Sequence, residues 1–369
     1  MQQLNILWGL LPVLLSLLLT SGVVLLVGEN PLEVFQLILD GALGNVKSLA
    51  GVVNFWLPLL LACMGLVVTF RAGLWNIGVE GQIMIGAVCA TGVALYPPPL
   101  PSELVIGLSI LAGMLGGMAW GLLIGLLRTR LGVHEIFGGT GLNALANLVA
   151  IYLISGPWLP AEGGSAQGTA PIPAVSRLAS LSAEFPVSGL MLVLVAIATV
   201  LVILVLAYTR WGLQLKATGH NARSALLLGV PVERTLWSAL IVCGMLAGLA
   251  GAYRVMFVYN NLRPLLSGGI GFLALLAVLL AGMRAVWVPL IAFAFSVILV
   301  GSTRLKITLQ LDQSLAGVLQ GALVLISLFV NGMRERVSRQ RGLVVEPVAD
   351  TAEEHPLITT TQMVEGTSR

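Results

Sequence analysis

Long apolar runs, separated by short polar or glycine-rich segments, occupy most of this chain. A helix needs roughly 20 apolar residues to cross the hydrocarbon core of a bilayer. Ten runs approach or reach that length, and each predicts a membrane-spanning helix. The runs are 6–27, 52–70, 78–96, 104–127, 136–158, 187–208, 236–258, 270–283, 286–302 and 314–331. The pattern therefore predicts an all-α, polytopic membrane protein with about ten spans, in which residues 1–332 form the transmembrane domain.

The two ends of the chain and the eighth run need separate interpretation. Residues 6–27 lack a basic leading segment and a cleavage site of small residues before Gly28, so we expect a retained span and not a removed signal peptide. Residues 270–283 are too short to cross upright, which is typical of a discontinuous helix. A basic cluster and then polar and acidic residues follow the last run, and we expect 333–369 to be a disordered cytoplasmic tail.

The composition excludes a large soluble enzyme. Of the 369 residues, 57% are hydrophobic and 9% are charged, whereas a soluble domain carries roughly 25% charged residues. Forty-three glycines suit closely packed membrane helices. Cys63, Cys89 and Cys243 lie inside apolar runs without metal-ligand spacing, so we expect small buried residues and no metal site.

Lysine and arginine residues in short loops favour the cytoplasmic side of a membrane. With both termini in the cytoplasm, twelve such residues lie inside and five lie outside, so the sequence predicts an N-in, C-in orientation. The outer five are Lys47, Arg177, Arg263, Arg304 and Lys306. The inner twelve are Arg71, Arg128, Arg130, Arg210, Lys216, Arg223, Arg234, Arg284, Arg334, Arg336, Arg339 and Arg341.

A glycine-rich stretch, residues 70–82, separates the second and third runs. It contains Glu80, the only carboxylate inside a predicted span, and a carboxylate at that depth costs about 2.5 to 3.5 kcal/mol. Its glycines interrupt helix geometry, and a helix broken at membrane depth is typical of a solute pathway. Two roles for Glu80 carry equal weight. It is either a carboxylate that fixes the break through hydrogen bonds or a pair with Arg71, or a group in the solute path.

A second glycine-rich stretch, residues 266–272, lies between the seventh and eighth runs. In the predicted orientation the second span runs inward and the seventh outward. We therefore hypothesise an inverted repeat, with spans 2–5 and 7–10 as its halves. Trp75 and Phe272 flank the two breaks and are suited to stack on a ring of the solute, although ordinary packing is the simpler expectation.

Amide side chains accompany the breaks. Asn76 and Gln82 suit hydroxyl-rich or heterocyclic solutes, and they equally suit the polar groups of a broken main chain. Asn143 and Asn147 are four residues apart and share a helix face, where bonding between helices is favoured over contact with the solute. The candidate residues of the solute path are Asn76, Glu80, Gln82, Asn143, Asn147 and Phe272.

The longest inner connection, residues 209–235, contains a short predicted helix. Asn221 is a good N-cap for residues 222–228, Gly229 closes the helix, and a proline two residues later prevents its continuation. Ala222, Ala225 and Leu226 share one face of it. Either this helix lies on the lipid headgroups or it contacts a cytoplasmic partner, and its spacing does not choose between the two.

Signals of catalysis are missing from the sequence. It has no glycine loop of the nucleotide-binding type and no nucleophile with a matching base, so we expect no enzyme activity and no cofactor. His134 and His220 are too far apart in sequence to suggest a metal site. Nothing indicates a nucleic-acid partner. An ion-coupled secondary transporter remains an alternative, and an intramembrane enzyme is the weakest one.

Four blocks of residues resemble the permease subunits of bacterial ABC importers for nucleosides and simple sugars, a group similar to the ribose and branched-chain amino acid permeases. The resemblance covers most of residues 50–330, and its first and third blocks are the more specific. The blocks are Phe70 to Gln82, then Gly132 to Ile136 leading to Asn143, then Gly219 to Val230 running into Gly244 to Ala252, and last Gly269 to Gly282.

The resemblance implies that a separate ABC ATPase subunit uses ATP and docks on a coupling helix within 209–235. It further implies a second permease subunit, homologous or identical, an extracytoplasmic substrate-binding (lipo)protein, and a place in the bacterial inner membrane. The implied solute is a nucleoside or simple sugar, with a branched-chain amino acid as the alternative. The implied coupling residues are Gly219, His220, Asn221, Ala222, Arg223, Ala225, Leu226 and Gly229.

Three positions depart from that family's pattern. The family often has Asn where His134 stands, an acidic or amide residue where Arg254 stands, and an acidic residue where Leu273 stands. These differences bear on the solute more than on the architecture.

Overall fold

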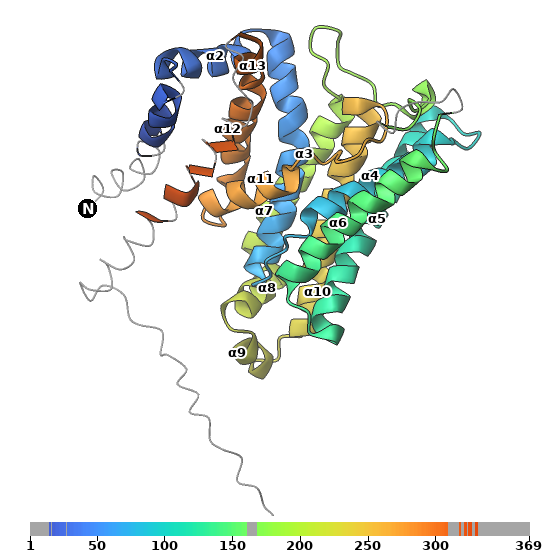
Figure 1. Ribbon diagram of the computed structural model, residues 1–369. Helices are drawn as coiled ribbons and strands as arrows, with labels where there is room; N and C mark the ends of the chain where they lie inside the picture. The colour runs from blue at the N-terminus through green and yellow to red at the C-terminus, as the bar shows by residue number, and fades with distance from the viewer. Residues whose placement is uncertain are drawn as a thin grey trace, which may run out of the picture.

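Helices form most of the chain wherever the structure describes it (Figure 1). The computed structural model describes residue 15, residues 17–26, 28–160 and 168–308, and part of 317–330. No strand occurs in these ranges, which confirms the all-α prediction. The elements are α2 (Pro31–Leu43), α3 (Val46–Arg71), α4 (Val79–Leu95), α5 (Ser102–Leu131), α6 (Glu135–Ser155), a 3₁₀ turn η1 (Ala174–Ser176), α7 (Gly189–Tyr208), α8 (Arg210–His220), α9 (Ala222–Leu227), α10 (Val232–Tyr253), a π-helical turn η2 (Arg254–Tyr259), α11 (Ile270–Leu280), α12 (Val288–Gly301) and α13 (Thr303–Thr308).

Six of the described helices are long and apolar enough to cross a membrane, so the prediction of ten spans is not confirmed. With 17 and 11 residues, α4 and α11 are apolar but shorter. The helical residues 17–26 meet α2 at an angle of 110°. Parts of the predicted first and tenth spans, and all of the predicted tail 333–369, lie outside the described residues. The six helices are Val46–Arg71, Ser102–Leu131, Glu135–Ser155, Gly189–Tyr208, Val232–Tyr259 and Val288–Leu305.

The apolar pattern missed α2 and the first turns of α3, because capping residues and not run length determine where these helices begin. Asn30 caps α2 by accepting a hydrogen bond from the backbone N–H of Leu32 at 3.0 Å, and Pro31 occupies the first helical position. Asn45 caps α3 in the same way, accepting from the N–H of Ser48 at 2.7 Å. Both helices therefore start before the second apolar run, which begins at residue 52.

The centre of the bundle is formed by α3, α4, α5 and α10, and α5 crosses α10 at closely packed glycines. A Cβ atom added to Gly117 would lie 2.7 Å from the Cα of Gly248, and one added to Gly244 would lie 2.8 Å from the Cα of Met118. Small residues of this kind let two membrane helices bring their main chains into contact. A larger side chain at position 117 or 248 would separate α5 from α10.

The described part of the long loop between α6 and α7 packs on the end of α10. Backbone N–H groups of Thr169 and Ile172 donate to the carbonyl groups of Leu262 and Asn260, each at 2.9 Å. The N–H of Leu178 donates to the carbonyl of Met256 at 3.2 Å. The sequence left the order of this loop open, and the structure ties it to the segment that leads into the second break.

The two ends of the bundle carry different elements (Figure 1). α8 and α9 lie at one end, here called the α9 end, and α2 and α13 lie at the other, here called the α2 end. The C-terminal end of α3 rests on the end of α8, since a Cβ atom on Gly73 would lie 3.1 Å from the Cα of Gly219. The break after α3 is therefore in direct contact with the segment that leads into α9.

Candidate functional site

The predicted break between the second and third apolar runs is present. α3 ends at Arg71, residues 72–78 are not helical, and α4 begins at Val79. Gly73 adopts a left-handed conformation with φ of +76°, which glycine reaches without a steric penalty. The chain therefore turns between α3 and α4, and the polar groups of that turn need partners inside the bundle.

Glu80 binds the N-terminus of α11. Its Oε1 accepts a hydrogen bond from the backbone N–H of Gly269 at 2.8 Å, and its Oε2 accepts one from Gly271 at 2.6 Å. The carboxylate is 6% exposed. Charge-assisted bonds to two free N–H groups at the positive end of a helix explain how a buried carboxylate is tolerated there. The two breaks of the sequence thus meet at one contact.

The pairing of Glu80 with Arg71, which the sequence offered as one alternative, is not formed. No ion pair joins Arg71 to any described residue, and its Nε is buried without a hydrogen-bond partner there. The other alternative, a hydrogen-bonded carboxylate that fixes the break, describes the observed geometry. A role of Glu80 in a solute path stays a prediction.

Asn143 closes the same break from α6. Its Oδ1 accepts from the N–H of Gly81 at 2.7 Å, and its Nδ2 donates to the carbonyl of Ile77 at 3.0 Å. This confirms the expectation that Asn143 bonds a neighbouring segment. Asn147 differs, because its Nδ2 donates at 3.2 Å to the carbonyl of Asn143 on its own helix. The shared face predicted for the two amides does not give them the same role.

Asn76 and Gln82 face each other in the interior. The Nδ2 of Asn76 lies 3.4 Å from Oε1 of Gln82 and 3.2 Å from the sulfur of Cys243, and both amides are at most 1% exposed. The Oδ1 of Asn76 and the Nε2 of Gln82 have no partner among the described residues. The same holds for the indole Nε1 of Trp120, which lies 2.9 Å from where a Cβ on Gly81 would be.

These side chains gather around the first break and the start of α4, and we call the group the polar seam. Trp120 belongs to it, and the sequence gave no sign of this because the residue lies inside an unbroken apolar run. Phe272 does not belong to it, since this side chain is 48% exposed. Trp75 is 43% exposed and packs on Phe70 with ring centroids 5.1 Å apart. The polar seam consists of Asn76, Glu80, Gln82, Trp120 and Asn143.

A second buried carboxylate, Glu135, lies just outside the predicted spans, so Glu80 remains the only carboxylate within them. Glu135 begins α6, is 7% exposed and forms an ion pair with Arg128 at 2.7 Å. Its Oε1 also accepts from the backbone N–H of Trp75 at 3.4 Å. The sequence did not indicate its burial, because Glu135 directly precedes the apolar run that begins at residue 136. It connects the first break to the ends of α5 and α6.

Arg254, one of the departures from the family pattern, is a buried cation beside the second break. Its Nε donates to the carbonyl of Leu266 at 2.8 Å, and its Nη2 donates to the hydroxyl of Tyr259 at 2.7 Å. The guanidinium lies 4.9 Å from the ring centroid of Tyr259, a cation–π arrangement. Arg254 is 4% exposed and has no ion-pair partner in the described part of the chain.

The short helix predicted at 222–228 is present as α9. The Oδ1 of Asn221 accepts from the N–H of Ser224 at 2.9 Å, and Gly229 follows with φ of +80°. The predicted apolar face is divided, however: Ala225 is buried against the bundle while Leu226 is 63% exposed. Two more exposed leucines, which the sequence analysis did not single out, extend this apolar surface: Leu227 and Leu228.

The remaining coupling candidates lie at the same end of the bundle. Gly219 and His220 are exposed and end α8, and Arg223 and Ala222 are exposed on α9. No partner chain is present against which to test them, so their role in coupling stays a prediction.

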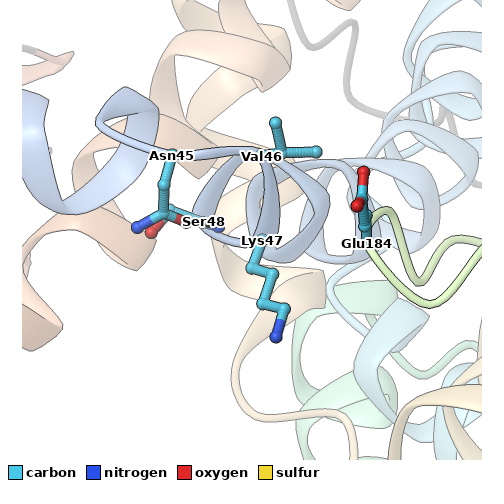
Figure 2. A pocket seen from close by; sticks show the side chains of 5 residues that line it. All are labelled: Asn45, Val46, Lys47, Ser48 and Glu184. Carbon is cyan, nitrogen blue, oxygen red and sulfur yellow. Dashed lines mark hydrogen bonds between the residues drawn. The ribbon is translucent and has the colours of Figure 1, made fainter.

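A cavity of about 600 Å³ lies at the α2 end, far from the polar seam. Figure 2 shows Lys47 and Glu184 beside it, with their charged groups pointing in opposite directions. Asn45 and Ser48 also line it, although they are already joined by the cap of α3. Because α3 has 26 residues, this cavity is about 39 Å along the helix from the first break.

Comparison with known proteins places these features in a wider group. The family described as "Branched-chain amino acid transport system / permease component" matches residues 48–328. The nucleoside ABC transporter permease protein NupB of Lactococcus lactis is 27% identical over 313 residues, which cover 81% of this chain and 84% of that protein. The glucose ABC transporter permease protein TsgB13 of Haloferax volcanii is 27% identical, over 84% of each chain. The guanosine ABC transporter permease protein NupP of Bacillus subtilis is 24% identical, over 82% of this chain and 87% of the relative.

Proposed function

This chain belongs to the branched-chain amino acid transport system / permease component family, and on that premise we propose that it carries a nucleoside or simple sugar across a membrane. It is a multi-pass membrane permease of an ABC transporter and not an enzyme. The relatives named for nucleoside, guanosine and glucose transport favour a hydroxyl-rich or heterocyclic solute. The family description itself keeps a branched-chain amino acid as the alternative.

The observation that carries this proposal is the set of unpaired polar atoms in the polar seam. Oδ1 of Asn76, Nε2 of Gln82 and Nε1 of Trp120 are buried without partners among the described residues. Each such group costs about 1 to 3 kcal/mol when it is cut off from water. A state in which the broken helices move apart would let these groups bind water, ring nitrogens or hydroxyl groups. The seam then serves as the closed form of a solute path, and Glu80 and Asn143 hold it together.

Coupling to ATP hydrolysis follows a short route through the structure. Transporters of this family work with an ATPase and a substrate-binding protein. We assign the ATPase contact to the exposed leucine surface of α9, together with Gly219, His220, Asn221 and Arg223. Gly219 lies against Gly73, and three residues further on Asn76 enters the seam. A pull on α9 therefore reaches the first break without an intervening helix. The permease itself needs no cofactor.

The remaining assembly is proposed from the same premise. A second permease subunit, identical or homologous, completes the membrane part, and an extracytoplasmic binding (lipo)protein delivers the solute to the α2 end. The α9 end faces the cytoplasm of a bacterial cell and the protein sits in its inner membrane, with both termini inside. The cavity beside Lys47 and Glu184 is then exposed to the delivering protein.

Transport assays on the reconstituted permease, ATPase and binding protein test the proposal. Wild-type proteoliposomes are expected to accumulate labelled nucleoside or sugar only when ATP is present. Gln82→Leu removes the unpaired Nε2 together with Oε1, which accepts one long hydrogen bond from Asn76. Because these two effects oppose each other, stability is expected to stay level while uptake falls at least about tenfold, since a loss of about 1.4 kcal/mol of polar contacts to a solute lowers its affinity tenfold.

Thr199→Val is the matched control, because Thr199 Oγ1 is also buried and unpaired among the described residues but lies on α7, outside the seam. Its uptake is expected to match the wild type. Wild-type uptake by Gln82→Leu would remove the seam from the solute path. Accumulation by the permease alone, without ATPase and ATP, would replace the importer with an ion-coupled carrier.

A further inference from the structure

A second cavity, of about 500 Å³, lies near the α9 end of the bundle, and its charged lining is entirely basic. Three elements contribute a cation each: Arg71 from the last turn of α3, Lys216 from α8, and Arg284 from the turn between α11 and α12. Among the described residues, no carboxylate lines it. We call this cavity the basic pocket.

The three cations lack partners among the residues that the structure describes. No ion pair and no side-chain hydrogen bond joins any of them to the part of the chain that the structure describes. The Nε of Arg71 is moreover buried, without a partner in those residues. Three like charges around one cavity repel one another, so their convergence is stabilised by an anion between them. A guanidinium with free N–H groups is suited to a phosphate oxygen.

The rest of the basic pocket is apolar and belongs to the outer surface of the bundle. Ala207, which is exposed, comes from the last turn of α7, the helix with the highest mean hydropathy of the six spans, 3.3. Val286 and Trp287 are 67% and 53% exposed. Exposed tryptophan beside an apolar span is typical of the boundary between hydrocarbon and headgroups. The pocket therefore offers a cationic inner wall and an apolar rim at the depth of a lipid headgroup.

We propose that the basic pocket binds the phosphate headgroup of an anionic phospholipid from the leaflet at the α9 end. The charges select the phosphate, and the rim of Ala207, Val286 and Trp287 receives the first part of the acyl chains. Basic pockets between membrane helices recognise anionic headgroups by this combination. An acidic protein segment would use the cations but leave the apolar rim exposed to water.

Occupancy would add one more connection between three parts of the protein. Arg71 ends the helix before the first break, Lys216 precedes α9 by a turn and a half, and Arg284 follows α11. One bound headgroup therefore holds the two broken helices and the approach to α9 in the arrangement observed. The proposal concerns lipid binding alone and stands whether or not the transported solute is a nucleoside.

Native mass spectrometry of the full-length detergent-solubilised chain tests it. The probes are phosphatidylglycerol, phosphatidylcholine with the same acyl chains, and glycerol phosphate. The wild type is expected to retain phosphatidylglycerol over phosphatidylcholine. The double variant Lys216→Gln/Arg284→Gln leaves Arg71 in place. It is expected to weaken that retention roughly tenfold or more, since each Lys or Arg near an anionic headgroup contributes about 1 kcal/mol of binding free energy. Thermal stability in phosphatidylcholine alone verifies that the variant is folded.

Arg130→Gln/Arg210→Gln/Arg234→Gln is the matched control. These three residues are exposed cations near the α9 end that do not line the pocket. Their loss is expected to leave retention unchanged. If the control loses phosphatidylglycerol retention to the same extent, general surface charge explains the binding and the proposal is overturned. If glycerol phosphate binds as tightly as the lipid, the pocket is a site for a soluble phosphate ester. The same double variant is also tested in the complex with the ATPase. If it loses the ATPase while lipid retention is unchanged, the pocket is a protein contact.

Discussion

Glu80 and Glu135 are both carboxylates buried within the bundle, yet they are neutralised in different ways. Glu80 accepts hydrogen bonds from two backbone N–H groups at the start of α11, whereas Glu135 forms an ion pair with the side chain of Arg128. The partner of Glu135 has a side chain 31% exposed and is able to turn to water when the pair breaks. The backbone amides of α11 cannot turn away unless the helix moves. The first contact is therefore a connection between two helices, and the second is a local ion pair.

The largest effect is expected from closing the space between α4 and α11. A Cβ atom at position 271 would lie 2.5 Å from Oε2 and 2.8 Å from the backbone nitrogen of Glu80. Gly271→Ala should therefore break the carboxylate contact and lose about 3 to 5 kcal/mol of unfolding free energy, from overpacking together with the lost charged hydrogen bonds. Unfolding in detergent, followed by circular dichroism, measures the change.

Gly107→Ala on α5 is the control for this substitution, because no atom of the described residues lies within 4 Å of the added Cβ. It is expected to be neutral or to stabilise the helix by up to ~1 kcal/mol. A Gly271→Ala protein with wild-type stability would show that the contact between α4 and α11 is not fixed by this geometry.

A smaller, graded effect is expected from neutralising the two carboxylates. Glu80→Gln places an amide donor against one of two backbone donors, and we expect a loss of about 2 kcal/mol together with reduced uptake by a normally inserted protein. Glu135→Gln should lose about 1 kcal/mol, because Arg128 regains water. Paired measurements of unfolding and of ATP-driven uptake decide the order. If the two variants lose the same unfolding free energy, or if Glu80→Gln in an assembled complex shows wild-type uptake, the two carboxylates do not differ in the way described.

The smallest effect separates the two asparagines of α6. Asn143→Ala removes bonds to both sides of the first break and should lose about 1 to 2 kcal/mol. Asn147→Ala removes one bond to its own helix and an unpaired oxygen, and a change below about 0.5 kcal/mol is expected. The same unfolding assay measures both. A reversed order would mean that satisfying the main chain of the break is not what Asn143 contributes.

The sequence predicted local helices and the fold class, but it did not predict which residues far apart in the chain contact one another. The apolar runs located α4, α7 and α11 within a few residues, and the cap at Asn221 located α9 because the signal is contained in neighbouring positions. α8 escaped notice since it lies in a polar connection, and α2 because its start depends on Asn30.

The same distinction between local signals and long-range contacts holds for the candidate site. Glycines and a carboxylate in an apolar sequence identified the break around Glu80, and the helical spacing of the amides pointed to Asn143. No periodicity states which backbone N–H group a carboxylate will bind, so the contact with Gly271 was out of reach. Trp120 entered the polar seam only through the packing of α5 on α4. The basic pocket likewise depends on three cations that are separated along the chain and meet in space.

The bond between Glu80 and α11 also constrains how the protein is made. The two glycines that Glu80 binds follow it by 189 and 191 residues in the chain, so α4 enters the bilayer long before its partner is synthesised. During that interval the nascent chain holds an unmatched carboxylate at a depth that costs about 2.5 to 3.5 kcal/mol. The early helices must wait at the insertion machinery, or keep this group near water, until the last third of the protein arrives to complete them.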